Sequence, residues 1–374
     1  MEISAPVPLG MEPSMMILAA PGLEAFIRES AQLGRRPVLM HELGGEEERK
    51  SVGPRELLER TRTRLAKLED GMLEKWGAGA RVTSVEEAGL FAVAGFTWFT
   101  LELADAVNQR AGAMSLDELD PAIVALEDGG TYPLGWHASY LEREFEVEAG
   151  VRIQFSDEVL ARAAVKFGPV LALAEEMEQT IRSCWHGRGD WPDVVVALTP
   201  SRSALTREEM FFVATQLRAR SGGLPAVAPG LGFFCEPGNE MAEAAVLAET
   251  IAGLTACGGV LGLALPARAA EVPGVAGARV LDATDDGRLA ALAALVKAEP
   301  AAFREWLDAA RQAFPIAHGG WPISLSEEEV RFLPQVEDGE LAAVFLETVH
   351  GRQLLLSTWP QVNASAWGQK LRAL

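Results

Sequence analysis

The chain has 374 residues, of which 49% are hydrophobic and 23% are charged, so it can bury a large core and is not a disordered protein. Its formal net charge of −20 repels nucleic-acid phosphates and anionic membrane surfaces, so the composition predicts neither as a partner. A local basic pocket for a small acidic molecule stays compatible with this charge, because net charge averages over the whole surface.

The cysteines and the N-terminal segment indicate the cellular compartment. Cys184, Cys235 and Cys257 lie far apart and form no C-x-x-C pair, which predicts neither a disulfide framework nor a zinc ribbon. The segment 1–20 lacks the basic start and the long apolar stretch of a signal peptide, and no run reaches the about 20 apolar residues of a membrane span. These features predict a cytoplasmic protein.

Short apolar runs alternate with amphipathic segments along the first half of the chain. Residues 57–76 carry leucines among charged residues at spacings that predict a helix. Residues 96–101 are aromatic and β-branched, which predicts a buried strand. Ser115 and Glu118 form a capping box at the start of a short helix that ends near Gly129.

The second half of the chain repeats this alternation. Ser156 caps the strongest predicted helix, 157–181, with a kink expected at Gly168-Pro169. Thr206 and Glu209 form a second capping box, for a helix that continues to about Arg220. The other predicted elements are strands at 194–198, 226–228, 260–265 and 278–281, and helices at 241–254, 288–297 and 303–314.

The order and character of these elements predict the fold class. Strands that are apolar throughout suit a parallel sheet covered by helices, and each helical crossover makes neighbouring strands parallel. The strand-to-helix spacing is regular and no glycine-rich dinucleotide turn follows the first strand, which favours a (β/α)8 TIM-type barrel with outer helices over an open sheet. We expect one domain over 1–374, with an N-terminal extension at 1–35 and a C-terminal cap at 319–374.

Motifs of known catalytic chemistry are incomplete or missing in the sequence. There is no P-loop, nucleophile elbow or H-E-x-x-H pattern, and the calcium-loop-like run 282–287 has Ala293 where the bidentate glutamate belongs. Of the five histidines, His41 directly follows the predicted strand 37–40 and is the best candidate for the barrel mouth. His137 follows Trp136 in a loop that can stack on a sugar ring. The commoner interpretation of His41 is a structural histidine of the core, and that of Trp136 is a tryptophan that fills one end of the barrel.

Several segments resemble one enzyme family. Residues 94–100 read A-G-F-T-W-F-T and residues 160–168 read L-A-R-A-A-V-K-F-G, while 212–217 and 300–305 read F-V-A-T-Q-L and P-A-A-F-R-E. They are similar to the A-G-[FY]-T-F-F-T strand, the A-R-A-A-V-K-Y-G helix and matching segments of the tagaturonate epimerase family. These enzymes are metal-dependent barrels that invert one carbon of a keto sugar acid. The resemblance implies a barrel and a carbohydrate-acid ligand.

The polar motifs of that family are altered in this chain. Its G-A-D-A-D-H motif is replaced by Ala-Gly-Ala-Arg at 78–81, and its T-I-D-P-S-D-H motif keeps two acids at 100–106 but loses the histidine. Its V-D-E-T-E and H-S-G-S-D-K strand ends become L-T-P-S-R at 198–202 and A-L-P-A-R-A at 264–269. Each change removes a group that can bind a divalent ion or carry a proton, and a metal needs three or four protein ligands.

We therefore expect a divergent, epimerase-like barrel without metal-dependent catalysis and without a cofactor. It would be a binding or regulatory pseudoenzyme, or an enzyme with a changed activity on a small carbohydrate acid. An ordinary role at the rim of the barrel is the alternative for each charged candidate. The candidate substrate-binding residues are acids, arginines for a ligand carboxylate, and histidines: Glu102, Asp105, Glu236, Arg81, Arg268, His41 and His137.

Two competing hypotheses stay open at this point. An active metal-dependent keto-sugar-acid epimerase would bind its divalent ion through His41, Glu42, Glu102 and His137. A structural partner of another protein would form a stable hetero-complex and would have no affinity for sugar acids. The sequence predicts no oligomeric state.

Overall fold

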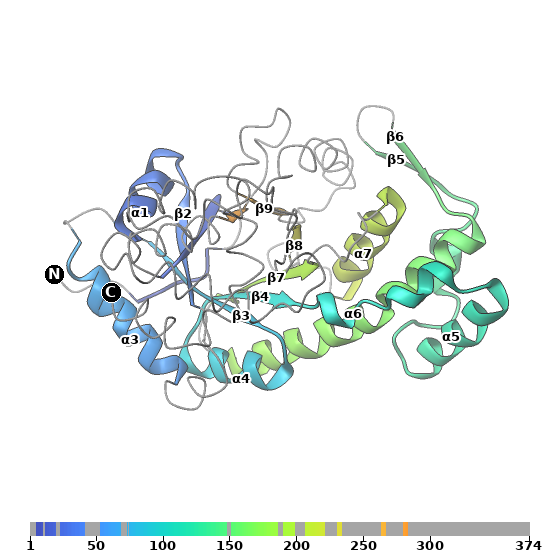
Figure 1. Cartoon of the computed structure of the whole chain (residues 1–374), viewed down its shortest axis with the longest axis horizontal. Coiled ribbons are helices and arrows are strands. Elements are labelled where there is room, and N and C mark those ends of the chain that lie inside the picture. The colour runs from blue at the N-terminus through green and yellow to red at the C-terminus, as the bar shows by residue number, and fades with distance from the viewer. Residues whose placement is uncertain are drawn as a thin grey trace, which may run out of the picture.

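Eight parallel strands pair in a closed ring in a computed structural model of the chain (Figure 1). The strands are β1 (Ser14–Leu18), β2 (Arg36–His41), β3 (Gly77–Val82), β4 (Trp98–Glu102), β7 (Asp193–Leu198), β8 (Gly230–Phe233), β9 (Leu263–Pro266) and β10 (Val280–Asp282). Their order around the barrel is β1-β10-β9-β8-β7-β4-β3-β2. The structure describes residues 5–9, 12–19, 23–41, 53–68, 73, 75–147, 151–185, 190–198, 206–220, 230–233, 263–266 and 280–282.

Helices and short 3-10 turns connect these strands. The helices are α1 (Leu23–Gln32), α3 (Pro54–Leu65), α4 (Val85–Ala94), α5 (Leu116–Asp128), α6 (Asp157–Trp185) and α7 (Arg207–Arg220). The 3-10 turns are η1 (Ala104–Ala106), η2 (Gln109–Ala113) and η3 (Trp136–Ser139), and β5 (Glu144–Val147) pairs with β6 (Val151–Gln154) in an antiparallel hairpin. The predicted α/β class with a parallel sheet is confirmed. No helix in the described part of the chain is long and apolar enough to cross a membrane.

Local capping determines where several helices begin. The backbone and side chain of Ser115 both donate to the Glu118 carboxylate, at 2.7 and 2.9 Å, which confirms the capping box predicted for α5. At the start of α7, the Thr206 amide donates to the Glu209 carboxylate and the Glu209 amide donates to the Thr206 hydroxyl, which confirms the second predicted capping box. At the end of α4, Gly95 takes φ 100°, a left-handed conformation that glycine adopts without strain.

The barrel strands alternate between an inner and an outer face. Met16, Val38, Met40, Trp98 and Val195 pack together on the inner face. The residues between them, including Leu39, Phe99 and Val196, face the helices in the larger cluster that also contains residues of α3, α4 and α6. This alternation follows from the two-residue period of a strand, so it fixes which side chains point into the barrel.

A group of aromatic residues in the larger core cluster packs around α5, α7 and the β5–β6 hairpin. In Figure 1, α6 runs below the strands and extends to α5 and the β5–β6 hairpin at the far end of the molecule. Trp136 stacks on Tyr132 with ring centroids 4.6 Å apart and meets Phe212 of α7 edge-on. Its indole NH donates to the Glu127 carboxylate at 3.0 Å. Trp136 therefore fills the space between α5 and α7.

Several elements differ from those predicted. Residues 1–35, predicted as an extension, contain α1 and the barrel strand β1, which pairs with β2 and β10. The helix predicted over 57–76 ends at Leu65, and β3 follows it at Gly77–Val82. The strand predicted at 226–228 lies outside the described residues, and β8 begins at Gly230. The other elements outside the described residues are the helices predicted at 241–254, 288–297 and 303–314 and the cap predicted at 319–374.

Candidate functional site

Arg81 and Glu102 form an ion pair at the carboxyl ends of β3 and β4. The distance from Arg81 Nη1 to Glu102 Oε1 is 2.6 Å, and the two side chains are 11% and 33% exposed. Both residues lie on the inner face: Arg81 follows Gly79, whose Cβ position points at Met40, and Glu102 follows Trp98 and Thr100 in alternation. Both residues were predicted from the sequence as substrate-binding candidates, and the structure places them in contact.

The neighbouring strands β7 and β8 carry small residues in register with Glu102. Glu102 is in register with Ala197 of β7, and Ala197 is in register with Gly232 of β8. Neither neighbour supplies a charged or hydrogen-bonding side chain. The end of β4 is held in place because the Leu103 amide donates to the Ala197 carbonyl at 3.1 Å. The pair can therefore offer a fixed guanidinium and a fixed carboxylate to a small polar ligand.

His41 lies at the carboxyl end of β2, as predicted, but its ring is on the outer face. The ring is 6% exposed, with Nε2 3.3 Å from Thr61 Oγ1 on α3 and an edge contact to Phe96 at 5.2 Å between centroids. Burial, with a smaller effect of the Arg64 charge, lowers the pKa of His41 to about 4. His41 is therefore a neutral histidine in the layer between strands and helices, which corrects its expected place at the barrel mouth.

Two further predicted site residues, Asp105 and His137, are not brought together with the ion pair. Asp105 lies in η1 just after β4 and is exposed, and no hydrogen bond joins it to Arg81 or Glu102 within the described part of the chain. His137 lies in η3, exposed next to the buried Trp136, and follows α5 instead of a strand. Glu236, Arg268 and the alternative ligand Glu42 lie outside the described residues.

Comparison with known proteins identifies the family. A model of the tagaturonate epimerase family matches residues 25–234, more than half of the chain. The chain belongs to the tagaturonate epimerase family. The resemblance inferred from the packing motifs of the sequence is thereby confirmed.

Solved structures show the same fold at low sequence identity. A glycerol-bound crystal structure of fructuronate-tagaturonate epimerase UxaE from Cohnella laeviribosi superposes with a TM-score of 0.74 at 16% identity, over 99% of this chain and 78% of that chain. The native crystal structure of that enzyme gives a TM-score of 0.68 at 16% identity, over 95% and 74% of the two chains. No curated protein sequence matches this chain.

The described residues of this epimerase-family member do not fit a divalent metal ion. Among them, no three histidine, cysteine, aspartate or glutamate side chains gather closely enough to bind one. At the end of β4, the Glu102 carboxylate is bound by the Arg81 guanidinium, whose positive charge repels a second cation. The metal-dependent alternative requires His41 and Glu102 to bind the same ion, but the His41 ring faces the outer helices and the Glu102 carboxylate faces the barrel interior.

A second ion pair in this family member was not found from the sequence. Lys166 of α6 and Glu209 of α7 are 2.6 Å apart, with side chains only 11% and 15% exposed. The Lys166 carbonyl accepts a hydrogen bond at 2.9 Å from the amide of Asn108, in the segment that follows η1. The ion pair thus joins α6 to α7, and the Lys166 backbone joins α6 to the segment that leaves β4. Lys166 sits within an apolar helical run, a placement that could have indicated a buried partner.

Proposed function

We propose that this member of the family binds a small carbohydrate acid at the carboxyl ends of its barrel strands, without metal-dependent catalysis. The Arg81–Glu102 pair on the inner face carries this proposal. Ligands of α/β barrels bind at this end of the strands, because the loops that follow the strands surround it. A site that combines a guanidinium with a carboxylate suits a molecule that has both an acid group and hydroxyl groups.

The two side chains have different roles in this proposal. The planar guanidinium of Arg81 donates paired hydrogen bonds to the ligand carboxylate, and it is held in place by Glu102. Because two carboxylates repel each other, the ligand carboxylate is kept away from Glu102. Glu102 then accepts hydrogen bonds from ligand hydroxyl groups.

A binding experiment tests this proposal on the full chain. A panel of hexuronates and keto-hexonates is screened by thermal shift and calorimetry, since a ligand that binds only the folded state raises the melting temperature. The Arg81→Met variant should lose at least tenfold in affinity, because it keeps the stem length but removes the charge-assisted hydrogen bonds. Arg60→Met is the matched control, since Arg60 is exposed on α3 and pairs with Glu56 in its own helix. Failure of every acid to bind, or equal binding by Arg81→Met, would refute the proposal.

An active, metal-dependent sugar-acid epimerase is the second candidate, and family membership favours it. Stoichiometric manganese, zinc or nickel in the purified protein, with epimerase activity that a chelator abolishes, would establish it in place of the first. A stable hetero-complex with no affinity for sugar acids would instead indicate a structural role. We also propose a cytoplasmic protein whose remaining helices complete the (β/α)8 pattern.

A further inference from the structure

A buried ion pair lies at the same end of the barrel as the proposed sugar-acid site. Lys166 of α6 and Glu209 of α7 are 2.6 Å apart, and their side chains are 11% and 15% exposed. Glu209 is in the first turn of α7, the helix that follows β7, and β7 pairs with β4. A helix that follows a barrel strand begins near the carboxyl end of that strand. The ion pair is therefore at the end of the barrel where Glu102 lies.

Lys166 contacts two segments that lie next to neighbouring strand ends. Its backbone carbonyl accepts a hydrogen bond at 2.9 Å from the amide of Asn108, in the segment that leaves β4. Its ammonium group donates to Glu209 Oε1 at 2.6 Å. One residue thus joins the segment that leaves β4 to the start of α7, the first through its backbone and the second through its side chain.

Glu209 extends this connection to the residue that precedes α7. Its second carboxylate oxygen, Oε2, accepts a hydrogen bond from the Thr206 amide at 3.1 Å, and its own amide donates to the Thr206 hydroxyl at 3.2 Å. The strand ends themselves are joined by the hydrogen bond from the Leu103 amide to the Ala197 carbonyl, and Ala197 is in register with Glu102. The ion pair therefore completes a set of hydrogen bonds that links the chain after β4 to the start of α7.

Stability does not by itself explain this ion pair. Burying two charges has a desolvation cost that their attraction often only offsets, so apolar residues of similar size can be equally stabilising. An ion pair does fix one relative position, because its donor and acceptor must meet at one distance and angle, whereas apolar side chains can pack in several positions. Arg220 and Glu175 join the same two helices near the end of α7 at 2.8 Å, but there the acid is 37% exposed. The pair at the start of α7 is thus the more buried of the two.

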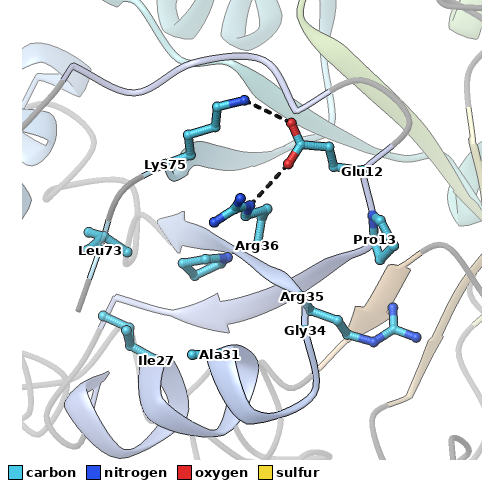
Figure 2. A pocket seen from close by; sticks show the side chains of 10 residues that line it. Glu12, Pro13, Ile27, Ala31, Gly34, Arg35, Arg36, Leu73 and Lys75 are labelled. Atoms are coloured by element: carbon cyan, nitrogen blue, oxygen red, sulfur yellow. Dashed lines mark hydrogen bonds and ion pairs between the residues drawn. The ribbon is translucent and has the colours of Figure 1, made fainter. Parts of the chain in front are cut away.

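A charged cluster at the other end of the barrel is of a different kind. Lys75 and Arg36 bind the two oxygens of the Glu12 carboxylate at 3.1 and 3.0 Å, beside a cavity of about 330 Å³ (Figure 2). Glu12 precedes β1, Arg36 begins β2 and Lys75 precedes β3, so the cluster joins the amino ends of three strands. Ion pairs with side chains 38–54% exposed contribute little, and the amino ends of barrel strands serve stability more than function. Lys75 therefore provides a comparison for Lys166 that lies far from the proposed site.

We propose that Lys166 and Glu209 are positioning residues for the sugar-acid site. The inference rests on the proposed function, in which Glu102 holds Arg81 and accepts hydrogen bonds from ligand hydroxyl groups. Both roles require the Glu102 carboxylate to stay in one place, since hydrogen bonds weaken steeply when their geometry changes. By joining the segment that leaves β4 to the start of α7, the ion pair restricts the backbone next to Glu102. Lys166 and Glu209 do not touch the ligand and act through Glu102.

Hydrogen exchange of the full chain without ligand tests the connection itself. Lys166→Met should speed exchange of the Asn108 amide and of the amides at the start of α7 about tenfold relative to amides of α1, which follows the opposite strand of the barrel. The comparison with α1 removes the effect of global stability, because unfolding of the whole chain exposes all amides. Lys75→Met, the same substitution at the amino end of the barrel, and Glu175→Gln, near the other end of α7, are the controls. Neither control should change exchange at Asn108 or at the start of α7.

Calorimetry with tagaturonate as the probe tests the effect on the site. Lys166→Met should bind about tenfold more weakly, whereas Lys166→Arg, which keeps a cation facing Glu209, should bind within about threefold of the wild type. The double variant Lys166→Met/Glu209→Met separates positioning from stability. It should be more stable than Lys166→Met, because no buried charge is left without a partner. It should nevertheless bind tagaturonate as weakly as Lys166→Met, because the connection is still missing.

The two experiments distinguish failure of this inference from failure of the sugar-acid proposal. Unchanged exchange at Asn108 and the start of α7 in Lys166→Met, or binding as tight as in the wild type by either methionine variant, overturns the positioning role. A wild type that binds no sugar acid overturns the proposed function instead, and faster exchange in Lys166→Met then still supports the connection between α7 and the segment that leaves β4. If Lys166→Met does not fold, the double variant and Lys166→Arg carry both experiments.

Discussion

Substituting Lys166 by methionine should destabilise the fold by breaking the ion pair between α6 and α7. Methionine keeps most of the volume of the lysine stem, so the main loss is the charge that Glu209 faces at 2.6 Å. Removing one partner of a fully buried pair costs about 3–5 kcal/mol, because the other charge stays buried without compensation. With 15% of the Glu209 side chain exposed, water offsets part of this cost, and we expect a loss of about 2–3 kcal/mol.

Urea unfolding followed by far-UV circular dichroism measures this loss as a lower midpoint with an unchanged slope. The double variant Lys166→Met/Glu209→Met completes the comparison, since an apolar pair in place of a buried ion pair is often close to neutral. Its stability should therefore recover towards that of the wild type. A double variant that is less stable than both single variants would refute the reasoning, because it would show that the charges themselves stabilise the interface.

Three further predictions concern the fold. The pKa of His41 is about 4 in the folded protein and 6.5 in the unfolded chain, so the unfolded chain binds more protons between these two pH values. The free energy of unfolding should therefore be highest above pH 6.5 and fall by about 3 kcal/mol towards pH 4. His41→Leu should flatten this part of the pH profile in urea titrations, and an unchanged profile would contradict the assignment. Gly79→Ala should lower the unfolding free energy by about 1–3 kcal/mol, since its Cβ would collide with Met40, while Gly112→Ala, which meets no atom, should stay within about 0.5 kcal/mol in the same assay. Tyr140→Phe should lower the free energy of unfolding by about 1–3 kcal/mol in thermal and urea unfolding, because the buried Gln216 amide loses the hydroxyl to which it donates at 2.9 Å. A variant as stable as the wild type would show that another group accepts a hydrogen bond from that amide.

The helix starts could be predicted because their signals are local. The capping boxes of α5 and α7 depend on residues three positions apart, and both form as expected. Strand β3 was missed because Gly77–Val82 opens with glycine and alanine instead of β-branched residues. The structure supplies the reason: the Met40 side chain fills the space that a residue larger than glycine would need at position 79. That requirement comes from a neighbouring strand, so the β3 sequence alone could not reveal it.

The candidate site was predicted in part for a similar reason. Arg81, the last residue but one of β3, and Glu102, the last residue of β4, were both predicted as candidates. The parallel pairing of β3 and β4 places Arg81 opposite Thr100, two residues before Glu102, so the two charged side chains can meet. His41 also ends a strand, but the apolar run before it has no polar alternation to show which face each residue takes. A one-residue change in phase moves a side chain from the barrel interior to the helix layer. The face of His41 could therefore be determined only from its contacts with Thr61 and Phe96.

The close packing at Gly79 restricts how this barrel could be redesigned to hold a metal. A new carboxylate on the inner face of β3 cannot be placed at position 79, because Met40 already occupies that volume. Position 81 is the next inward position towards the mouth, and an acid there would replace the guanidinium that neutralises Glu102. Position 81 can therefore carry either an acid that binds a metal ion or the arginine that binds an organic acid, and introducing the acid would remove the arginine.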